Sequence, residues 1–415
     1  MVKIYDNIIP DVTCKKLLDL FEKNEDYQEY INDNNWKDYI PKSLKDFYDK
    51  DKYKKAKEYK KANGKLSFFS STINFSITIF LLTLGLYGKV SDYFMINFDN
   101  IFIQSSLFFL TFYLFNLIIS IPFQYYSTFY IETKFGFNKT TINTFILDKL
   151  KGVFLALLIG GALLYATLLV YSKISHGFWI YLWLGLSFFT LFMNMFYTSL
   201  IVPMFNKLVP ISEGSLKEKI ETYSKKIGYS LNNIFIIDGS KRSTKANAYF
   251  SGIGPKKTIA LFDTLVEKHS EEELVAVLAH EVGHFKKKHI YQGLILSIIQ
   301  IGLITFLFEL CLNNSELIDS LGGKINSFHL GLVVFSMLYS PIGLITGIFM
   351  NILSRKNEYE ADKFAKETYN GDALVLALKK LSVNSLSNLY PHPFYVFVHY
   401  SHPPLIKRLD ALSSS

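Results

Sequence analysis

The sequence predicts a mainly α-helical protein that crosses a membrane several times and carries a short β-hairpin in a segment of soluble composition. Half of the 415 residues are hydrophobic and only 19% are charged, whereas about 25% of the residues in a typical soluble domain are charged. Six apolar runs are each about 20 residues or longer, which is enough helix to cross a hydrocarbon core of ~30 Å. These runs are residues 67–88, 101–121, 153–173, 177–205, 291–312 and 329–353.

Positive charge lies almost entirely on one side of these spans. That side receives residues 1–66, 122–152, 206–290 and 354–415. The cations of the other side are Lys89, Lys173 and Lys324. Because lysine and arginine are retained in the cytosol during insertion, the lysine-rich side is predicted to be cytosolic. Lysines that flank a membrane also account for the net charge of +8, so no nucleic-acid partner is expected.

The chain is expected to consist of five segments. In order, these are a polar cytosolic N-terminal segment (1–66), four transmembrane helices with a cytosolic loop at 122–152 (67–205), a cytosolic portion of soluble composition (206–290), two transmembrane helices (291–353) and a C-terminal portion (354–415). Residues 42–65 are rich in lysine and are predicted to form a solvated helix. No signal peptide is expected, because no short cationic region followed by an apolar core begins the chain. Cys14 and Cys311 are too few and too distant for a cysteine-based zinc site.

The soluble portion has its own predicted elements. Residues 214–229 have a helical composition, and residues 234–238 resemble a strand. Two further strand-like stretches, 247–250 and 258–262, flank a turn with glycine and proline, which predicts a β-hairpin. A helix is predicted to begin at Ser270, where a serine N-cap and three following glutamates form a capping box and match the helix dipole.

This helix contains the pattern His-Glu-x-x-His at residues 280–284. His280 and His284 are one helical turn apart, so their side chains lie on one face and can bind a single Zn²⁺ ion at ~2.1 Å. Glu281 is rotated by about 100° from His280, so it can take a proton from water at the open coordination position. The alternative is a membrane-edge helix with satisfied polar groups. That alternative is disfavoured because apolar neighbours would bury three ionisable groups without a shared partner.

A third protein ligand is expected beyond the sixth span. Zinc hydrolases hold the ion with three side chains, and His289 follows His284 too closely to be the third. In the acidic stretch 354–365, Glu358 and Asp362 share one helical face while Glu360 points away. Glu358 is therefore the predicted third ligand, and Asp362 is placed to accept the outer N–H of a ligating histidine.

A last polar cluster lies at residues 399–408. His402 and Arg408 suit the stabilisation of a tetrahedral oxyanion beside a zinc site. Taken alone, a tail loop with surface cations is the more common explanation for such a cluster, and the sequence leaves both open.

Together these motifs resemble the type I CAAX prenyl protease family of integral-membrane zinc metalloproteases. The segments that carry the resemblance are 128–141 (TFYIETKFGFNKTT), 203–220, 238–267, 278–289 (LAHEVGHFKKKH), 354–365 (SRKNEYEADKFA) and 399–412 (HYSHPPLIKRLDAL). The resemblance covers roughly residues 42–412. Members of the family usually have seven spans, and no span is found in residues 1–38.

The resemblance implies a helical barrel around an intramembrane chamber, with a zincin-like cytosolic portion at one end. It implies one Zn²⁺ per chain, and His402 and Arg408 correspond to positions that stabilise the intermediate or hold substrate. Asn247, Ala248 and Tyr249 correspond to an edge strand that pairs with the substrate backbone. The implied activity is removal of the last three residues from isoprenylated CaaX proteins. The implied location is the endoplasmic reticulum membrane, or the inner nuclear membrane, with the active site facing the cytosol. The chain is expected to act as a monomer.

Three other functions fit parts of the pattern. A general quality-control metalloprotease would share the zinc site but would not require a prenyl group. A non-enzymatic scaffold would keep a structural zinc ion. A transporter is disfavoured because its path usually needs charged residues within the spans, and Glu309 is the exception here.

Overall fold

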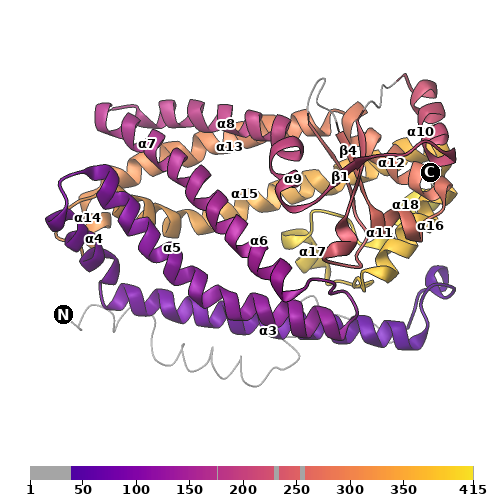
Figure 1. Ribbon diagram of the computed structural model, residues 1–415, viewed down its shortest axis with the longest axis horizontal. Coiled ribbons are helices and arrows are strands. Elements are labelled where there is room, and N and C mark those ends of the chain that lie inside the picture. Colours follow the sequence, from indigo (N-terminus) through magenta and orange to yellow (C-terminus); the bar gives the residue numbers. More distant parts are fainter. Residues whose placement is uncertain (1–38, 175, 229–232, 253–257, 415) are drawn as a thin grey trace.

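The computed structural model describes residues 39–174, 176–228, 233–252 and 258–414. Most of the polar segment 1–66, including the region 1–38 in which a first span was sought, thus lies outside the described residues. Figure 1 shows long helices filling one end of the molecule, with the strands and several short helices at the other. The metal-binding motifs belong to this second end.

Six helices of the described chain are long and apolar enough to cross a membrane, as predicted. They are α3 (Lys50–Thr83), α5 with its π-helical extension (Ile101–Glu132), α6 to α7 (Ile142–Lys173), α8 to α9 (Phe178–Phe205), α13 (His289–Leu312) and α15 (Phe328–Ala365). Large apolar side chains are exposed along them, for example Phe188 at 71% and Phe349 at 67%. Such surfaces are unfavourable in water and are expected where lipid covers the helix.

Several helices continue beyond the predicted spans at their polar ends. Most of the expected loop 122–152 is helical, because α5 (Ile101–Tyr125) continues through the π-helix η2 (Tyr126–Glu132) and α6 (Ile142–Leu155) begins early. α6 passes through η3 (Ala156–Gly160) into α7 (Gly161–Lys173). The lysine-rich stretch is helical, as predicted, but it is continuous with the first span in α3. Intrahelical hydrogen bonding does not depend on the side chains, so a helix can leave the hydrocarbon without ending.

Short helices complete the two ends of the bundle. α4 (Leu86–Asn97) and α14 (Ser315–Asp319) lie at the end remote from the sheet. The remaining helical elements of the described chain are η1 (Lys42–Leu44), α10 (Ser215–Lys226), η4 (Gly239–Lys241), α11 (Asp263–Lys268), α12 (Glu271–Lys286), the π-helix η6 (Lys366–Asn370), α16 (Gly371–Asn384), α17 (Pro393–His399) and α18 (Leu405–Ser414).

A four-stranded sheet contains the predicted hairpin and, as β2, the strand predicted at 234–238. Its strands are β1 (Leu208–Pro210), β2 (Ile234–Ile237), β3 (Ala248–Ser251) and β4 (Thr258–Phe262), in the order β1-β2-β4-β3. The hairpin itself is confirmed, since β3 and β4 are antiparallel with Ala248 opposite Leu261. β2 also pairs with β4 in parallel, and the three-residue β1 pairs with β2. β3 is an edge strand, so one side of its backbone is not used by the sheet.

The core of the soluble end surrounds helix α12. Leu274, Val275 and Leu278 are buried against residues of the sheet and of α16. The Ser270 side chain accepts a hydrogen bond from the Glu273 amide, which confirms the predicted N-cap. The second half of the capping box differs from the prediction, because the Glu273 carboxylate accepts from His269 Nδ1 at 2.8 Å and from Lys380 Nζ at 2.6 Å. One local partner, His269, and one tertiary partner, Lys380, take the place of the backbone amide.

Hydrogen bonds connect the loop before β3 to the membrane helices. Arg242 donates to both carboxylate oxygens of Asp148 on α6, at 2.7 and 2.8 Å, and to the Phe205 carbonyl at 2.8 Å. Asn138 and Ser243 form a β-bridge next to these contacts. The position of β3 relative to the bundle is therefore set by charge-assisted and backbone hydrogen bonds.

Candidate metal centre

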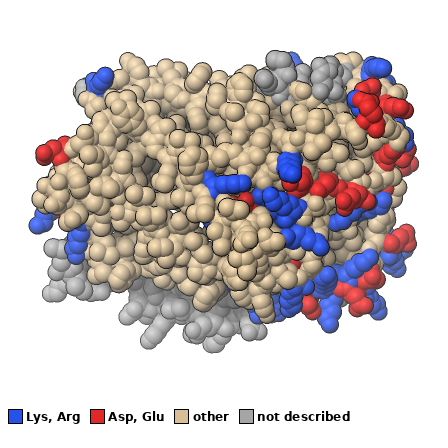
Figure 2. Space-filling model, viewed as in Figure 1, with Lys and Arg blue, Asp and Glu red and all other residues tan. Residues whose placement is uncertain are grey.

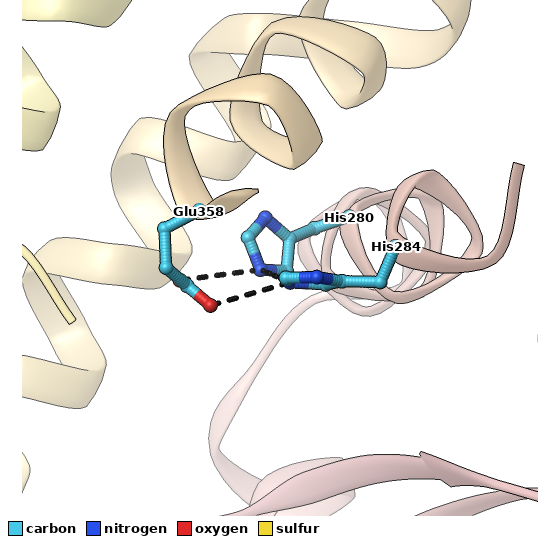
Figure 3. A group of neighbouring side chains, drawn as sticks. All are labelled: His280, His284 and Glu358. Atoms are coloured by element: carbon cyan, nitrogen blue, oxygen red, sulfur yellow. Dashed lines mark hydrogen bonds and ion pairs between the residues drawn. The ribbon is translucent and has the colours of Figure 1, made fainter. Parts of the chain in front are cut away.

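His280, His284 and Glu358 converge on one point between α12 and α15 (Figure 3). The two histidine Nε2 atoms are 3.1 Å apart. Glu358 places Oε1 at 3.2 Å from His284 Nε2 and Oε2 at 3.5 Å from His280 Nε2. Ligands that are ~2.1 Å from a tetrahedral ion lie about 3.4 Å from one another. The separations therefore fit three ligands of a single metal ion, as the sequence predicts.

The close approach of the two ligand-bearing helices depends on Gly283, in the middle of the motif. A Cβ atom at this position would lie 3.1 Å from the Ala361 Cα and 3.2 Å from the Phe364 Cβ. The absent side chain lets α15 pack directly on α12. This packing brings Glu358, almost one turn before Ala361, to the two imidazoles.

Asp362 lies behind His280, where the sequence predicts it. Its Oδ1 is 2.8 Å from His280 Nδ1, so it can hold the ring with Nε2 directed to the metal position. Arg408 binds the same carboxylate in a bidentate manner, with Nε to Oδ2 at 2.8 Å and Nη2 to Oδ1 at 2.5 Å. Arg408 is also 3.3 Å from Glu358 through Nη1. This single guanidinium thus pairs with two carboxylates that the site buries.

His289 has a role that the sequence reasoning missed. Its Nδ1 lies 3.1 Å from His284 Nδ1, and its Nε2 lies 3.1 Å from Glu360 Oε2. His289 is buried and follows a break between α12 and α13, where Lys288 has a φ of 61°. The spacing excluded His289 as a third ligand, yet the same proximity makes it a partner for the outer nitrogen of a ligand.

Glu281 lines the cavity beside the cluster without sharing the ligand face. Burial raises the pKa of its carboxyl above the usual value, although the nearby His280 and His284 oppose this shift. His402 reaches the cluster from the C-terminal portion, with Nε2 at 3.3 Å from Glu358 Oε1. Its side chain is 64% exposed, whereas that of Arg408 is 11% exposed. His402 can therefore meet a ligand in the cavity directly.

One cavity of about 880 Å³ joins the predicted site residues. Its wall includes the three residues of the metal cluster, Glu281, His402 and Arg408. Asn247, Ala248 and Tyr249, at the start of the edge strand β3, form another part of the wall. Asp362 stands behind this wall, in contact with His280. The arrangement can hold an extended peptide between an unpaired strand edge and a metal site.

Two family models match the sequence of the chain. A family model described as "CAAX prenyl protease N-terminal, five membrane helices" matches residues 30–207, and the model of peptidase family M48 matches residues 210–415. The described part of the first match contains four of the six long apolar helices. The chain is thus a multi-pass membrane protein with a metallopeptidase fold, and it belongs to peptidase family M48.

Individual relatives show more specifically to which family of metallopeptidases the chain belongs. The chain is 34% identical to the CAAX prenyl protease 1 homolog of Oryza sativa subsp. japonica, over 91% of this chain and 90% of the relative. It is also 34% identical to CAAX prenyl protease 1 of Saccharomyces cerevisiae, over 94% and 92% of the two chains. The crystal structure of S. mikatae Ste24p matches with a TM-score of 0.87 at 32% identity, covering 93% of this chain and 96% of the other. The chain belongs to the CAAX prenyl protease 1 family of membrane metallopeptidases.

Proposed function

We propose that this protein is a zinc-dependent endopeptidase that removes the three C-terminal residues from isoprenylated CaaX proteins. The observation that carries the proposal is the convergence of two imidazoles and a carboxylate in one cavity with Glu281 and an unpaired strand edge. The names of the relatives supply the substrate class. A membrane-embedded bundle is a suitable setting for a lipidated substrate.

The donor set favours zinc, with one ion per chain. Two imidazole nitrogens and one carboxylate, with a further position left for water or substrate, are the usual ligands of catalytic zinc. Among the described residues, the buried Glu358 Oε2 accepts no hydrogen bond, and its cationic neighbour Arg408 Nη1 is 3.3 Å away, so lone-pair capacity remains for a metal ion. His280, His284 and Glu358 would hold the ion, and Asp362 and His289 would orient the two rings.

The chain's own residues then have separate tasks. A zinc ion at this position supplies Lewis acidity toward a water molecule and the scissile carbonyl. Glu281 accepts a proton from the water and passes it to the leaving amine. His402 donates to the oxyanion as it develops. Strand β3, through Asn247, Ala248 and Tyr249, pairs with the substrate backbone. Arg408 holds Asp362 and Glu358, and as part of the cavity wall it also binds substrate.

The proposed setting is the endoplasmic reticulum membrane or the inner nuclear membrane, with the cavity facing the cytosol and one chain acting alone. The segments 206–290 and 354–415 together form the catalytic portion, and the spans within 67–205 and 291–353 form the membrane portion. The bias of lysine and arginine supports this orientation. In sealed microsomes, an impermeant thiol reagent is expected to modify a cysteine that replaces the cavity residue His402. Protection of this cysteine from the reagent would contradict the proposed orientation.

The proposal is tested with a farnesylated CaaX peptide and the same peptide without the lipid. Purified protein in lipid nanodiscs is expected to cleave the farnesylated peptide much faster, since the lipid anchors substrate at ~0.8 kcal/mol per buried CH₂. Equal rates would favour a general quality-control protease, which has no prenyl requirement.

Glu281→Gln tests the assignment of the proton acceptor. The variant is expected to lose about 10²–10⁴-fold in kcat, because a general base contributes that much, and to keep its zinc by elemental analysis. Glu272→Gln is the matched control, because Glu272 is on the same helix but pairs with Lys219 at the surface. Retained activity in Glu281→Gln would remove Glu281 from the mechanism.

A further inference from the structure

Lys245 lines the same cavity as the metal cluster but has no place in the chemistry described above. It precedes β3 by three residues. Its Nζ lies 2.7 Å from the Tyr59 hydroxyl and 2.9 Å from Glu132 Oε2, and 4.4 Å from the centroid of the Phe137 ring. The side chain is 35% exposed. An ammonium group has three N–H donors, so these two polar contacts hold Lys245 in place without using its full capacity.

Two lysines line this part of the cavity. Lys245 pairs with Glu132, and Lys60 is the second lysine of the cavity wall. Tyr59 precedes Lys60 in the sequence, and its hydroxyl accepts a hydrogen bond from Lys245. Aromatic rings on one side of the ammonium group keep it oriented. The cavity therefore has a cationic part that is built from α3, η2 and the loop before β3.

The two ends of β3 differ in their surroundings. Lys245 lies just before the first residue of the strand, Ala248. At the other end, the Ser251 hydroxyl is hydrogen-bonded to Thr198 on the membrane-spanning helix α8. A peptide along the free edge of β3 thus has a cationic pocket at one end and the membrane helices at the other.

The two ends of the segment that the proposed function removes or leaves match these two surroundings: one carries a lipid and the other a carboxylate. This step therefore rests on the proposed function. Its lipid is attached just before the scissile bond, and its free α-carboxylate ends the chain three residues beyond. The lipid belongs at the membrane end of β3 and the carboxylate at the cationic end, which makes the peptide antiparallel to β3. Three extended residues span ~10 Å, which is the distance that the carboxylate must lie beyond the scissile bond.

We propose that Lys245, held by Tyr59 and Glu132, binds the free α-carboxylate of the substrate and sets the cut at three residues from the C-terminus. Lysine and carboxylate form a charge-assisted hydrogen bond. Such a contact would reject a C-terminal amide, which carries no charge. Lys245 is a specificity-determining residue in this role and takes no part in proton transfer.

The test compares a farnesylated CaaX peptide that ends in a carboxylate with the same peptide as a C-terminal amide. The wild-type protein is expected to prefer the acid by about 10- to 100-fold in kcat/KM, the usual effect of a hydrogen bond to a charged group. Lys245→Met is expected to lose this preference by slowing only the acid, and Lys245→Arg to keep part of it. Binding of both peptides to the Glu281→Gln protein, measured at equilibrium, should show the same preference without turnover.

Lys268→Met is the matched control. Lys268 donates to the carbonyl of Thr244, next to Lys245, but it lies outside the cavity wall. It should leave the preference unchanged. Equal loss of acid and amide cleavage in Lys245→Met would show a purely structural role and overturn the inference. Equal cleavage of both peptides by the wild type would also overturn it, while the proposed function would stand. Cleavage of neither peptide would overturn the proposed function itself.

Discussion

Gly283 controls the distance between the helices that supply the metal ligands. In Gly283→Ala, the new Cβ would lie 3.1 Å from a backbone atom of Ala361, which is closer than ordinary van der Waals contact. α15 must then move by a few tenths of an ångström, and Glu358 moves with it. We expect zinc affinity to fall about tenfold, as for the loss of an outer-shell contact, when measured by competition with a chelator.

Gly293→Ala is the control for the general effect on zinc affinity of replacing a helical glycine by alanine. Gly293 is helical and a Cβ there meets nothing within 4 Å. This variant should keep wild-type zinc affinity. If Gly283→Ala also kept it, the close packing of the two helices would not determine the ligand geometry.

The three motif residues and Glu358 could be predicted from the sequence because helix periodicity and the charge bias together place them. His280 and His284 share a face at any turn of an α-helix, and the charge bias puts Glu358 on their side of the membrane. His289 could not be predicted as a partner of His284. Its position depends on the left-handed Lys288 at the junction of α12 and α13, and lysine carries no signal for that conformation.

At the scale of elements, Arg355 on α15 holds the C-terminal end of α17. Its Nη1 donates to the carbonyls of Val396, in the last turn of α17, and of Tyr400, just beyond it, at 2.9 and 2.5 Å. His402 is two residues beyond Tyr400. Arg355→Met should therefore displace His402 and lower kcat about tenfold or more, while zinc content stays at one ion per chain.

Lys356→Met provides the comparison for Arg355. Lys356 is the next residue of α15, is well exposed, and its Nζ is 3.8 Å from Glu360. Loss of its charge should leave kcat close to the wild-type value. Zinc loss in Arg355→Met would mean that the substitution disturbs α15 itself and not the loop of His402.

The elements that the sequence predicted correctly have local causes. The Ser270 N-cap and the β3–β4 hairpin each depend on a few adjacent residues. Strand β1 was missed because three residues that end in proline carry little strand signal. The parallel pairing of β2 with β4 joins segments on either side of β3, and no short-range pattern encodes that contact.

At the scale of the whole molecule, the two ends differ in the number of charged side chains on their surfaces. Figure 2 shows acidic and basic side chains gathered mainly over the end with the sheet and short helices, while the surface over the long helices is largely uncharged. α15 connects the two ends, since its 38 residues extend for ~57 Å at 1.5 Å per residue. It begins among the membrane helices and ends at the metal centre.

A second, apolar cavity of about 590 Å³ lies among α5, α7, α8, α13 and α15. Phe335 lines it, and 23 residues of α15 separate Phe335 from Glu358, which is ~35 Å of helix. A farnesyl chain of about a dozen bonds of ~1.5 Å cannot reach that far from the metal centre. This cavity is therefore too remote to hold the lipid of a bound substrate.

Gly161→Phe tests that separation by filling the remote cavity. Gly161 lines it, and a Cβ at this helical position meets nothing within 4 Å, so the larger side chain can enter. We expect the ratio of kcat/KM for the farnesylated and unprenylated peptides to stay within about twofold of the wild-type ratio, because the added ring does not reach the substrate. Gly152→Phe, on the same helical segment but outside the cavity wall, controls for bulk at a glycine of this helix. A loss of prenyl preference in Gly161→Phe alone would mean that the cavity communicates with the site and that the lipid extends into it.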